Sequence, residues 1–184
     1  MKKQKIQLLI LGVLLVLVIA AFFGVRSYNN RLAEEKTSEE NLYTVLSLTK
    51  EDVAEFSFSG GGDMVSLIKE DDVWNAVGDS SIELDQDKIR SLLDYVVDIQ
   101  AELEIEGVTD FSQYGFDDPL ATVTIKLQDD TVYEIVFGHF NEITSQYYLK
   151  LEGSDTVYGL SSNLGYHFQI TLDDLKKVEE ETEE

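Results

Sequence analysis

Short runs of alternating hydrophobic and polar residues, separated by turn signals, fill the chain between residues 45 and 176. Alternation with a period of two is typical of strands that bury one face. It places Ala54, Phe56 and Phe58 on one face of the first run. The predicted strands are 53–59, 64–69, 73–77, 122–128, 131–137, 146–151 and 156–160. Gly-rich or acidic turns are predicted at 59–63, 70–72, 129–130 and 152–155.

One segment has helical spacing instead. Apolar residues from Ile89 to Ile99 recur every three or four positions, and Asp85 precedes them as an N-cap. They predict an amphipathic helix from Asp85 to about Gln100. Two short helices are predicted near the C-terminus, one capped by Ser161 or Ser162 and one that starts at Thr171.

Hairpins followed by a helix occur twice along the chain, which predicts a weak internal duplication joined by residues 101–121. We therefore predict an α+β fold of antiparallel hairpins with helices packed on one face.

The N-terminal region has a different pattern. Residues 8–25 carry no charge, and with Ile6 and Gln7 the run reaches 20 residues, which as a helix spans ~30 Å. The run predicts a transmembrane anchor at residues 6–25. The lysines among residues 1–5 predict a cytoplasmic N-terminus, and thus an extracytoplasmic main domain. A cleavable signal peptide that ends near Ala20 is the alternative.

Charge divides the chain in the same way. The net charge is −22, yet residues 1–36 hold six basic and two acidic residues, and residues 37–184 hold eight basic and 34 acidic ones. The prediction is a stalk at 26–44, one domain at 45–176 and an acidic tail at 177–184. Because residues 37–184 are so acidic, this part of the chain is expected to repel nucleic acid and anionic lipid. The absence of cysteine excludes disulfides, thiol nucleophiles and Cys-ligated zinc.

The stretch Phe111 to Pro119, which leads into the strand predicted at 122–128, carries a family resemblance. Further matching features are the Gly after the strand predicted at 131–137, a later Val-Tyr pair and an upstream tryptophan. The motif residues are Tyr114, Gly115, Phe116, Asp117, Pro119, Gly138, Tyr158 and Trp74. Over about residues 45–175 the sequence resembles the family called domain of unknown function 4340, with Phe116 in place of the usual Leu.

The resemblance implies modest functional expectations. The family has no established catalytic activity, and some relatives are associated with auxiliary proteins of ABC transporters. The motif residues themselves are interpreted as structural, because Gly115 permits a positive φ and Pro119 fixes the chain before a strand.

No residue set in the sequence predicts catalysis, cofactor binding or a metal site. His139 and His167 lack the partners of a catalytic triad or a zinc site. The Gly-rich turn at 59–63 lacks the Lys of a phosphate loop. Asp71-Asp72 and Asp85-Gln86-Asp87 match no EF-hand loop.

The functional expectation is a single-pass membrane protein of the cell envelope. Its outer domain is expected to be a non-enzymatic accessory or binding module, with a membrane protein as partner and with no nucleic acid. Two alternatives stay open. One is an envelope hydrolase that uses Asp and Glu carboxylates, whose spacing is a matter of three dimensions. The other is a module that binds cations or wall polymers.

Overall fold

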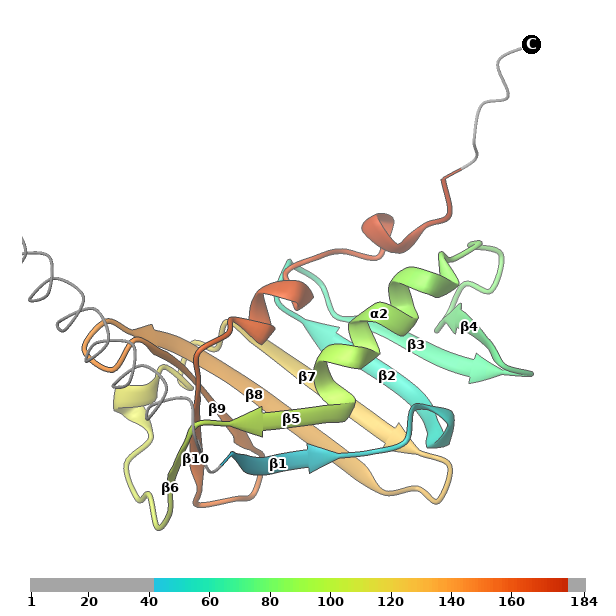
Figure 1. The fold of residues 1–184 in the computed structure, drawn as a ribbon. Helices are drawn as coiled ribbons and strands as arrows, with labels where there is room; N and C mark the ends of the chain where they lie inside the picture. The colour runs from blue at the N-terminus through green and yellow to red at the C-terminus, as the bar shows by residue number, and fades with distance from the viewer. Residues whose placement is uncertain (1–41, 179–184) are drawn as a thin grey trace, which may run out of the picture. The chain divides into compact units, whose positions relative to one another are not determined.

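A large antiparallel sheet dominates the computed structural model, which describes residues 42–178 (Figure 1). Its eight strands follow each other in the order β4 (Val73–Ala76), β3 (Val65–Glu70), β2 (Val53–Ser59), β7 (Ala121–Leu127), β8 (Val132–Asn141), β9 (Gln146–Leu151), β10 (Val157–Leu160) and β6 (Leu103–Ile105). A second sheet pairs β1 (Tyr43–Ser47) with β5 (Asp98–Ala101). Most neighbours in the large sheet are also neighbours in sequence, so short turns set most of its registers.

The α-helix among the described residues is α2 (Gln86–Val97). As predicted, Asp85 caps it, because its carboxylate accepts hydrogen bonds from the backbone N–H groups of Asp87 and Lys88. Four 3₁₀ turns complete the fold: η1 (Lys50–Asp52), η2 (Ser112–Tyr114), η3 (Leu164–Phe168) and η4 (Asp173–Leu175).

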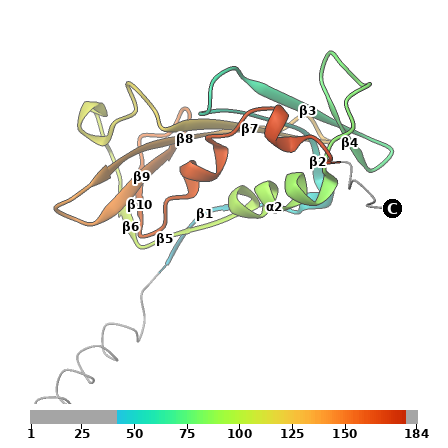
Figure 2. The ribbon, with the colours of Figure 1, turned by 90° about the horizontal axis from the view of Figure 1, so that it is seen from above.

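The two faces of the large sheet have different covers. Figure 2 shows α2, β1 and β5 on one side, and the segment that contains η2 on the other. The main core lies between the large sheet and the layer formed by α2, η3 and the small sheet. At the β8–β10 end, both faces of the large sheet are therefore covered by packed segments, as the hydrophobic residues on both faces require.

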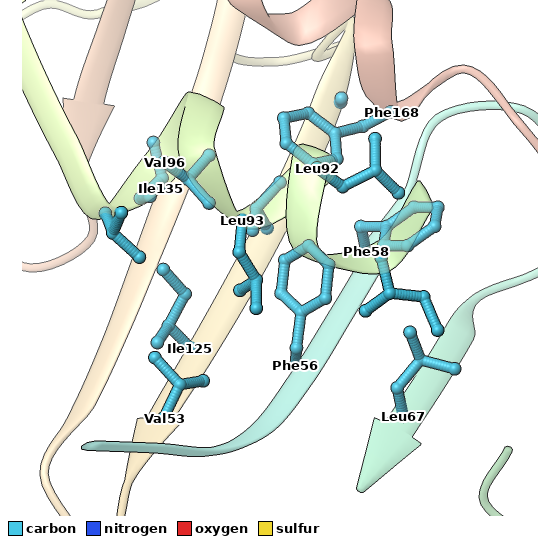
Figure 3. Packing of buried hydrophobic residues seen from close by; sticks show 14 of the residues in the cluster. Val53, Phe56, Phe58, Leu67, Leu92, Leu93, Val96, Ile125, Ile135 and Phe168 are labelled. Carbon is cyan, nitrogen blue, oxygen red and sulfur yellow. The ribbon is translucent and has the colours of Figure 1, made fainter. Parts of the chain in front are cut away.

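Aromatic rings fill the centre of the main core (Figure 3). Phe168, from η3, is fully buried, and its ring centroid lies 6.2 Å from that of Phe56, 5.6 Å from that of Phe58 and 5.9 Å from that of Phe137. Trp74 meets Phe56 edge to face at 6.4 Å. The C-terminal segment is thus held to the sheet by one ring that three strand aromatics surround.

The predicted α+β class is wrong, because the described residues are mostly β, with one α-helix and ten strands in two antiparallel sheets. Both predicted C-terminal helices are 3₁₀ turns that end in bonds between residues three apart, and Asn163 rather than Ser161 or Ser162 caps the first. The predicted duplication is also wrong. The second half has four consecutive strands and 3₁₀ turns where the first half has α2.

Periodicity misled the prediction at two places. The helix ends at Val97 rather than Gln100, and Ile99 is buried from strand β5, since its position fits both a helical and a strand period. In β2, a register shift between Val53 and Glu55 buries Val53 in place of Ala54, while Phe56 and Phe58 are buried as predicted.

Within residues 42–178, no helix is both long and apolar enough to span a membrane. The predicted anchor at 6–25 lies outside the described residues, together with almost all of the predicted stalk.

Phe168→Ala should lower the free energy of unfolding of the full-length chain by ~3–5 kcal/mol, because the change leaves a cavity among three aromatic rings. Tyr166→Ala is the matched control: Tyr166 belongs to the same 3₁₀ turn but is 65% exposed, so its loss should cost about 0.5 kcal/mol or less. Chemical denaturation measures both. Equal effects of the two changes would show that Phe168 does not hold the C-terminal segment.

Candidate functional site

A second hydrophobic cluster lies on the outer face of the large sheet, at its β8–β10 end. Successive strand residues point to opposite faces. Tyr148 and Val157 are buried in this cluster, whereas their neighbours Leu149 and Tyr158 pack in or against the main core. The half-buried members are Leu103, Ile105, Val108, Phe111 and Phe116. The segment between β6 and β7, which contains most of the family motif, therefore covers this end of the sheet (Figure 2).

Asp110 fixes the start of the motif. Its carboxylate accepts hydrogen bonds from the Ser112 hydroxyl at 2.7 Å and from the Ser112 backbone N–H at 3.0 Å. These two bonds favour the charged form and lower the pKa of the Asp110 carboxyl below its usual value. The 3₁₀ turn η2 follows and ends at Gly115, whose φ of +80° is left-handed. The structural interpretation of Gly115 is thus consistent with its backbone conformation.

A close backbone approach joins the motif to strand β8. The pairing of β8 with β9 shifts register between Phe137 and Phe140, as at a β-bulge, and Gly138 lies within this shift. A Cβ on Gly138 would lie 2.2 Å from the Tyr114 carbonyl oxygen, and one on Gly115 would lie 2.7 Å from His139 Cγ. Neither position has room for a side chain, so two glycines allow the motif to lie directly on the strand.

Aromatic contacts continue from the motif into the sheet. The Tyr114 ring packs edge to face on Tyr148, with centroids 4.9 Å apart, and lies 6.1 Å from Phe116. Lys150 Nζ lies 5.1 Å from the centroid of Phe111, and it also pairs with Glu152 at 2.7 Å. The Tyr114 ring therefore packs Tyr148 against the motif, and Lys150 adds a contact between β9 and Phe111.

Tyr148 in turn holds the end of the β8–β9 hairpin, residues 140–147, which we call the hairpin tip. The Asn141 side-chain amide donates to the Tyr148 hydroxyl at 3.0 Å. The Asn141 side-chain oxygen accepts from the backbone N–H of Ile143 at 2.9 Å and of Thr144 at 3.3 Å. The turn is therefore ordered by its own hydrogen bonds and is connected to the motif through one tyrosine.

The hairpin tip presents apolar side chains to solvent. Ile143 is 94% exposed at the turn, and Phe140 is 46% exposed with its ring 4.7 Å from that of Tyr147. An isoleucine held this far out gains nothing for the fold. The hairpin tip thus carries an exposed apolar side chain on a turn that is closed by side-chain hydrogen bonds.

The other predicted motif residues lie in different surroundings. Trp74 belongs to the main core at the opposite end of the sheet. Asp117 and Pro119 are exposed in the turn before β7. Tyr158 faces the main core side, and burial, with Glu104 and Glu106 nearby, raises the pKa of its phenol. The structure thus brings together Tyr114, Gly115, Phe116 and Gly138 only.

Each of the two histidines packs against another residue of the domain. His139 lies in strand β8 against Gly115, beyond residue 137, where the sequence predicted this strand to end. The His167 ring stacks on Tyr95 with centroids 3.7 Å apart. Across residues 42–178, no three His, Asp or Glu side chains are grouped closely enough to hold a metal ion.

Sequence reasoning missed the hairpin tip. The available signal was Ile143, one branched apolar residue in the otherwise polar turn Asn141–Ser145. Its exposure and the link through Asn141 to Tyr148 depend on the bulge in β8, which a linear pattern does not reveal.

These features define an acidic, mostly β domain in which a motif segment braces one hairpin. The chain belongs to the family described as Domain of unknown function (DUF4340), whose model matches residues 74–179, more than half of the sequence. The family predicted from the Phe111–Pro119 stretch is therefore confirmed. Its description names no catalytic activity. No curated protein and no solved structure matches the chain.

Gly115→Ala should destabilise the full-length chain more than Gly153→Ala does. The φ angles of the two glycines are nearly equal, +80° and +81°, so the left-handed strain of about 1–2 kcal/mol is common to both. A Cβ at Gly153 would meet open space, whereas a Cβ at Gly115 would overlap His139. This overlap should add about 1–3 kcal/mol to the destabilisation. Thermal unfolding of the two variants measures the difference. Equal losses would mean that the contact between Gly115 and His139 does not matter for stability.

Proposed function

We propose that this protein is a single-pass, membrane-anchored accessory protein whose extracytoplasmic domain binds a membrane protein partner through the hairpin tip. The role is non-enzymatic binding beside an envelope complex. The observation that carries the proposal is Ile143, which is 94% exposed on a turn that the family motif holds in place.

The sequence of the N-terminal region supports the membrane anchor. Residues 8–25 are uncharged, three lysines precede them and a strongly acidic body follows. This arrangement favours a cytoplasmic N-terminus and an outer domain. An anchor confines the domain to a thin layer above the bilayer, where the effective concentration of other membrane proteins is high.

The geometry of the hairpin tip supports binding. Exposed Ile143 and the Phe140–Tyr147 pair supply apolar area, and the hydrogen bonds of Asn141 keep the turn in one conformation. A preordered turn loses little conformational entropy when a partner covers it. Tyr148 connects this turn to the motif, which explains why a segment so far from the turn in sequence belongs to the same site.

Charge supports a protein rather than the lipid surface as partner. Residues 37–184 carry a net charge of −26, which disfavours contact with anionic headgroups. A partner with a basic outer face fits this charge. Because the family resemblance includes auxiliary proteins of ABC transporters, a transporter of that type is the first partner to test.

The topology predicts that protease added to intact, wall-stripped cells digests residues 42–178, because this part of the chain lies outside the membrane. Immunoblotting against an epitope at the C-terminus measures the digestion, and a cytoplasmic protein serves as control. A domain that resists protease until the cells are lysed would overturn the extracytoplasmic placement.

Ile143→Asp should abolish capture of the partner by the full-length chain, because it places a charge where an apolar contact is needed. Val132→Asp is the matched control: Val132 is 55% exposed at the first residue of β8, the end of that strand away from the hairpin tip, and the change adds the same charge. Cross-linking in native membranes, followed by mass spectrometry, should find a set of proteins with wild type and Val132→Asp that is missing with Ile143→Asp.

Binding to that partner should weaken as salt rises from low to physiological levels, where the Debye length is ~8 Å, because charge steers the encounter.

Capture that both aspartate variants retain would refute the hairpin tip as the binding surface. Hydrolysis of a wall glycan by the purified protein, lost when one carboxylate is changed, would refute the non-enzymatic role.

A further inference from the structure

Basic residues gather in one pocket of this acidic protein. The pocket has a volume of about 230 Å³, and its lining comprises Lys50, Glu51, Lys69, Asp72, Trp74, Gln86, Arg90 and Leu93. Residues 37–184 contain only eight basic residues, and three of them meet here. The lining residues come from η1, from the β3–β4 hairpin and from α2, which Figure 1 shows passing over β2 and β3.

The walls of the pocket are fixed by the fold. The Gln86 side chain accepts from the Trp74 backbone N–H at 2.8 Å and donates to the Trp74 carbonyl at 3.0 Å, which joins the start of α2 to strand β4. Lys69 and Trp74 are cross-strand partners, and Lys69 Nζ lies 5.8 Å from the centroid of the indole ring. The cation therefore stands over the aromatic floor of the pocket.

Lys69 has a positive charge that no carboxylate balances at close range. Its ammonium donates to the main-chain carbonyl oxygen of Glu51 at 2.7 Å, and within residues 42–178 no carboxylate oxygen lies within 4.0 Å of it. Because the carbonyl oxygen is neutral, this hydrogen bond does not balance the positive charge of Lys69. An ammonium group has three N–H donors, so it can also donate to an anion.

The other two cations are paired, but weakly. Lys50 pairs with Asp94 and Arg90 with Asp87, and the side chains of these two aspartates are 58% and 91% exposed. Exposed pairs contribute little to stability, so an arriving anion can compete for both cations. Glu51 and Asp72 also line the pocket, so three cations stand against two carboxylates in its lining.

We propose that this pocket binds a phosphate group, with Lys69 as the principal contact and with Lys50 and Arg90 beside it. Arginine and lysine together suit an oxyanion with several acceptor oxygens, and a phosphate carries more charge than a carboxylate. The volume admits one headgroup or small phosphorylated molecule rather than a polymer segment. The proposal is independent of the partner that the hairpin tip binds.

Trp74 provides the measurement, because it is the only tryptophan in the chain. Inorganic phosphate is titrated into the full-length protein in detergent at constant ionic strength, with acetate as the carboxylate control. We expect a saturable change in tryptophan emission with phosphate and a much weaker response to acetate. Glycerophosphoglycerol, a soluble phosphodiester, is titrated in parallel. Tighter binding of the diester assigns the pocket to a lipid or wall headgroup, and tighter binding of phosphate assigns it to a soluble phosphate monoester.

Lys69→Gln should raise the dissociation constant by about tenfold or more, equivalent to about 1.4 kcal/mol. Arg90→Gln, on the exposed face of α2, should act in the same direction and serves as a second test. Lys177→Gln removes the same charge from an exposed site outside the pocket and should leave the constant unchanged. No saturable response to either phosphate probe, an equal response to acetate, or unchanged binding in both pocket variants would overturn the proposal.

Discussion

The direct contact between the Tyr114–Gly115 backbone and the Gly138–His139 backbone governs the architecture of the β8–β10 end. A bulge in β8 and two glycines make this contact possible. Once the motif segment lies on the sheet, Tyr114 covers Tyr148, and the outer face of three strands is no longer exposed. Tyr148 in turn accepts a hydrogen bond from Asn141, which connects the motif to the hairpin tip.

The sequence predicted the local elements well and their assembly less well. Strands with strict alternation, such as β7, bury Val123 and Ile125 as expected, and Asp85 caps its helix. The failures have physical causes. Ile99 satisfies two periods, and β6 is only three residues long. The C-terminal segments form 3₁₀ turns, η3 with Asn163 as its cap and η4 with no side-chain cap. The fold class was wrong because these short segments were read as helix or as linker.

The candidate sites also differed in how far the sequence alone could predict them. The family motif was visible as a string of residues, so its structural interpretation followed from Gly115 and Pro119 alone. The hairpin tip and the basic pocket depend on contacts between distant segments: Tyr148 to Asn141 in one case, Lys69 to Glu51 in the other. The net charge of −26 over residues 37–184 does not reveal that three cations lie in one pocket.

The small β1–β5 sheet has a mechanical consequence under the membrane anchoring proposed above. β1 is the first strand of the described chain, and its backbone pairs with β5 but with no strand of the large sheet. A pulling force that enters at Leu42 is therefore resisted first by the pairing between β1 and β5 and by the burial of Val45 and Leu46 in the main core. Because β1 makes no backbone pair with the large sheet, its detachment would leave the eight-stranded ladder intact. In the membrane-anchored protein proposed above, β1 would supply an extensible element of about five residues at the start of the domain.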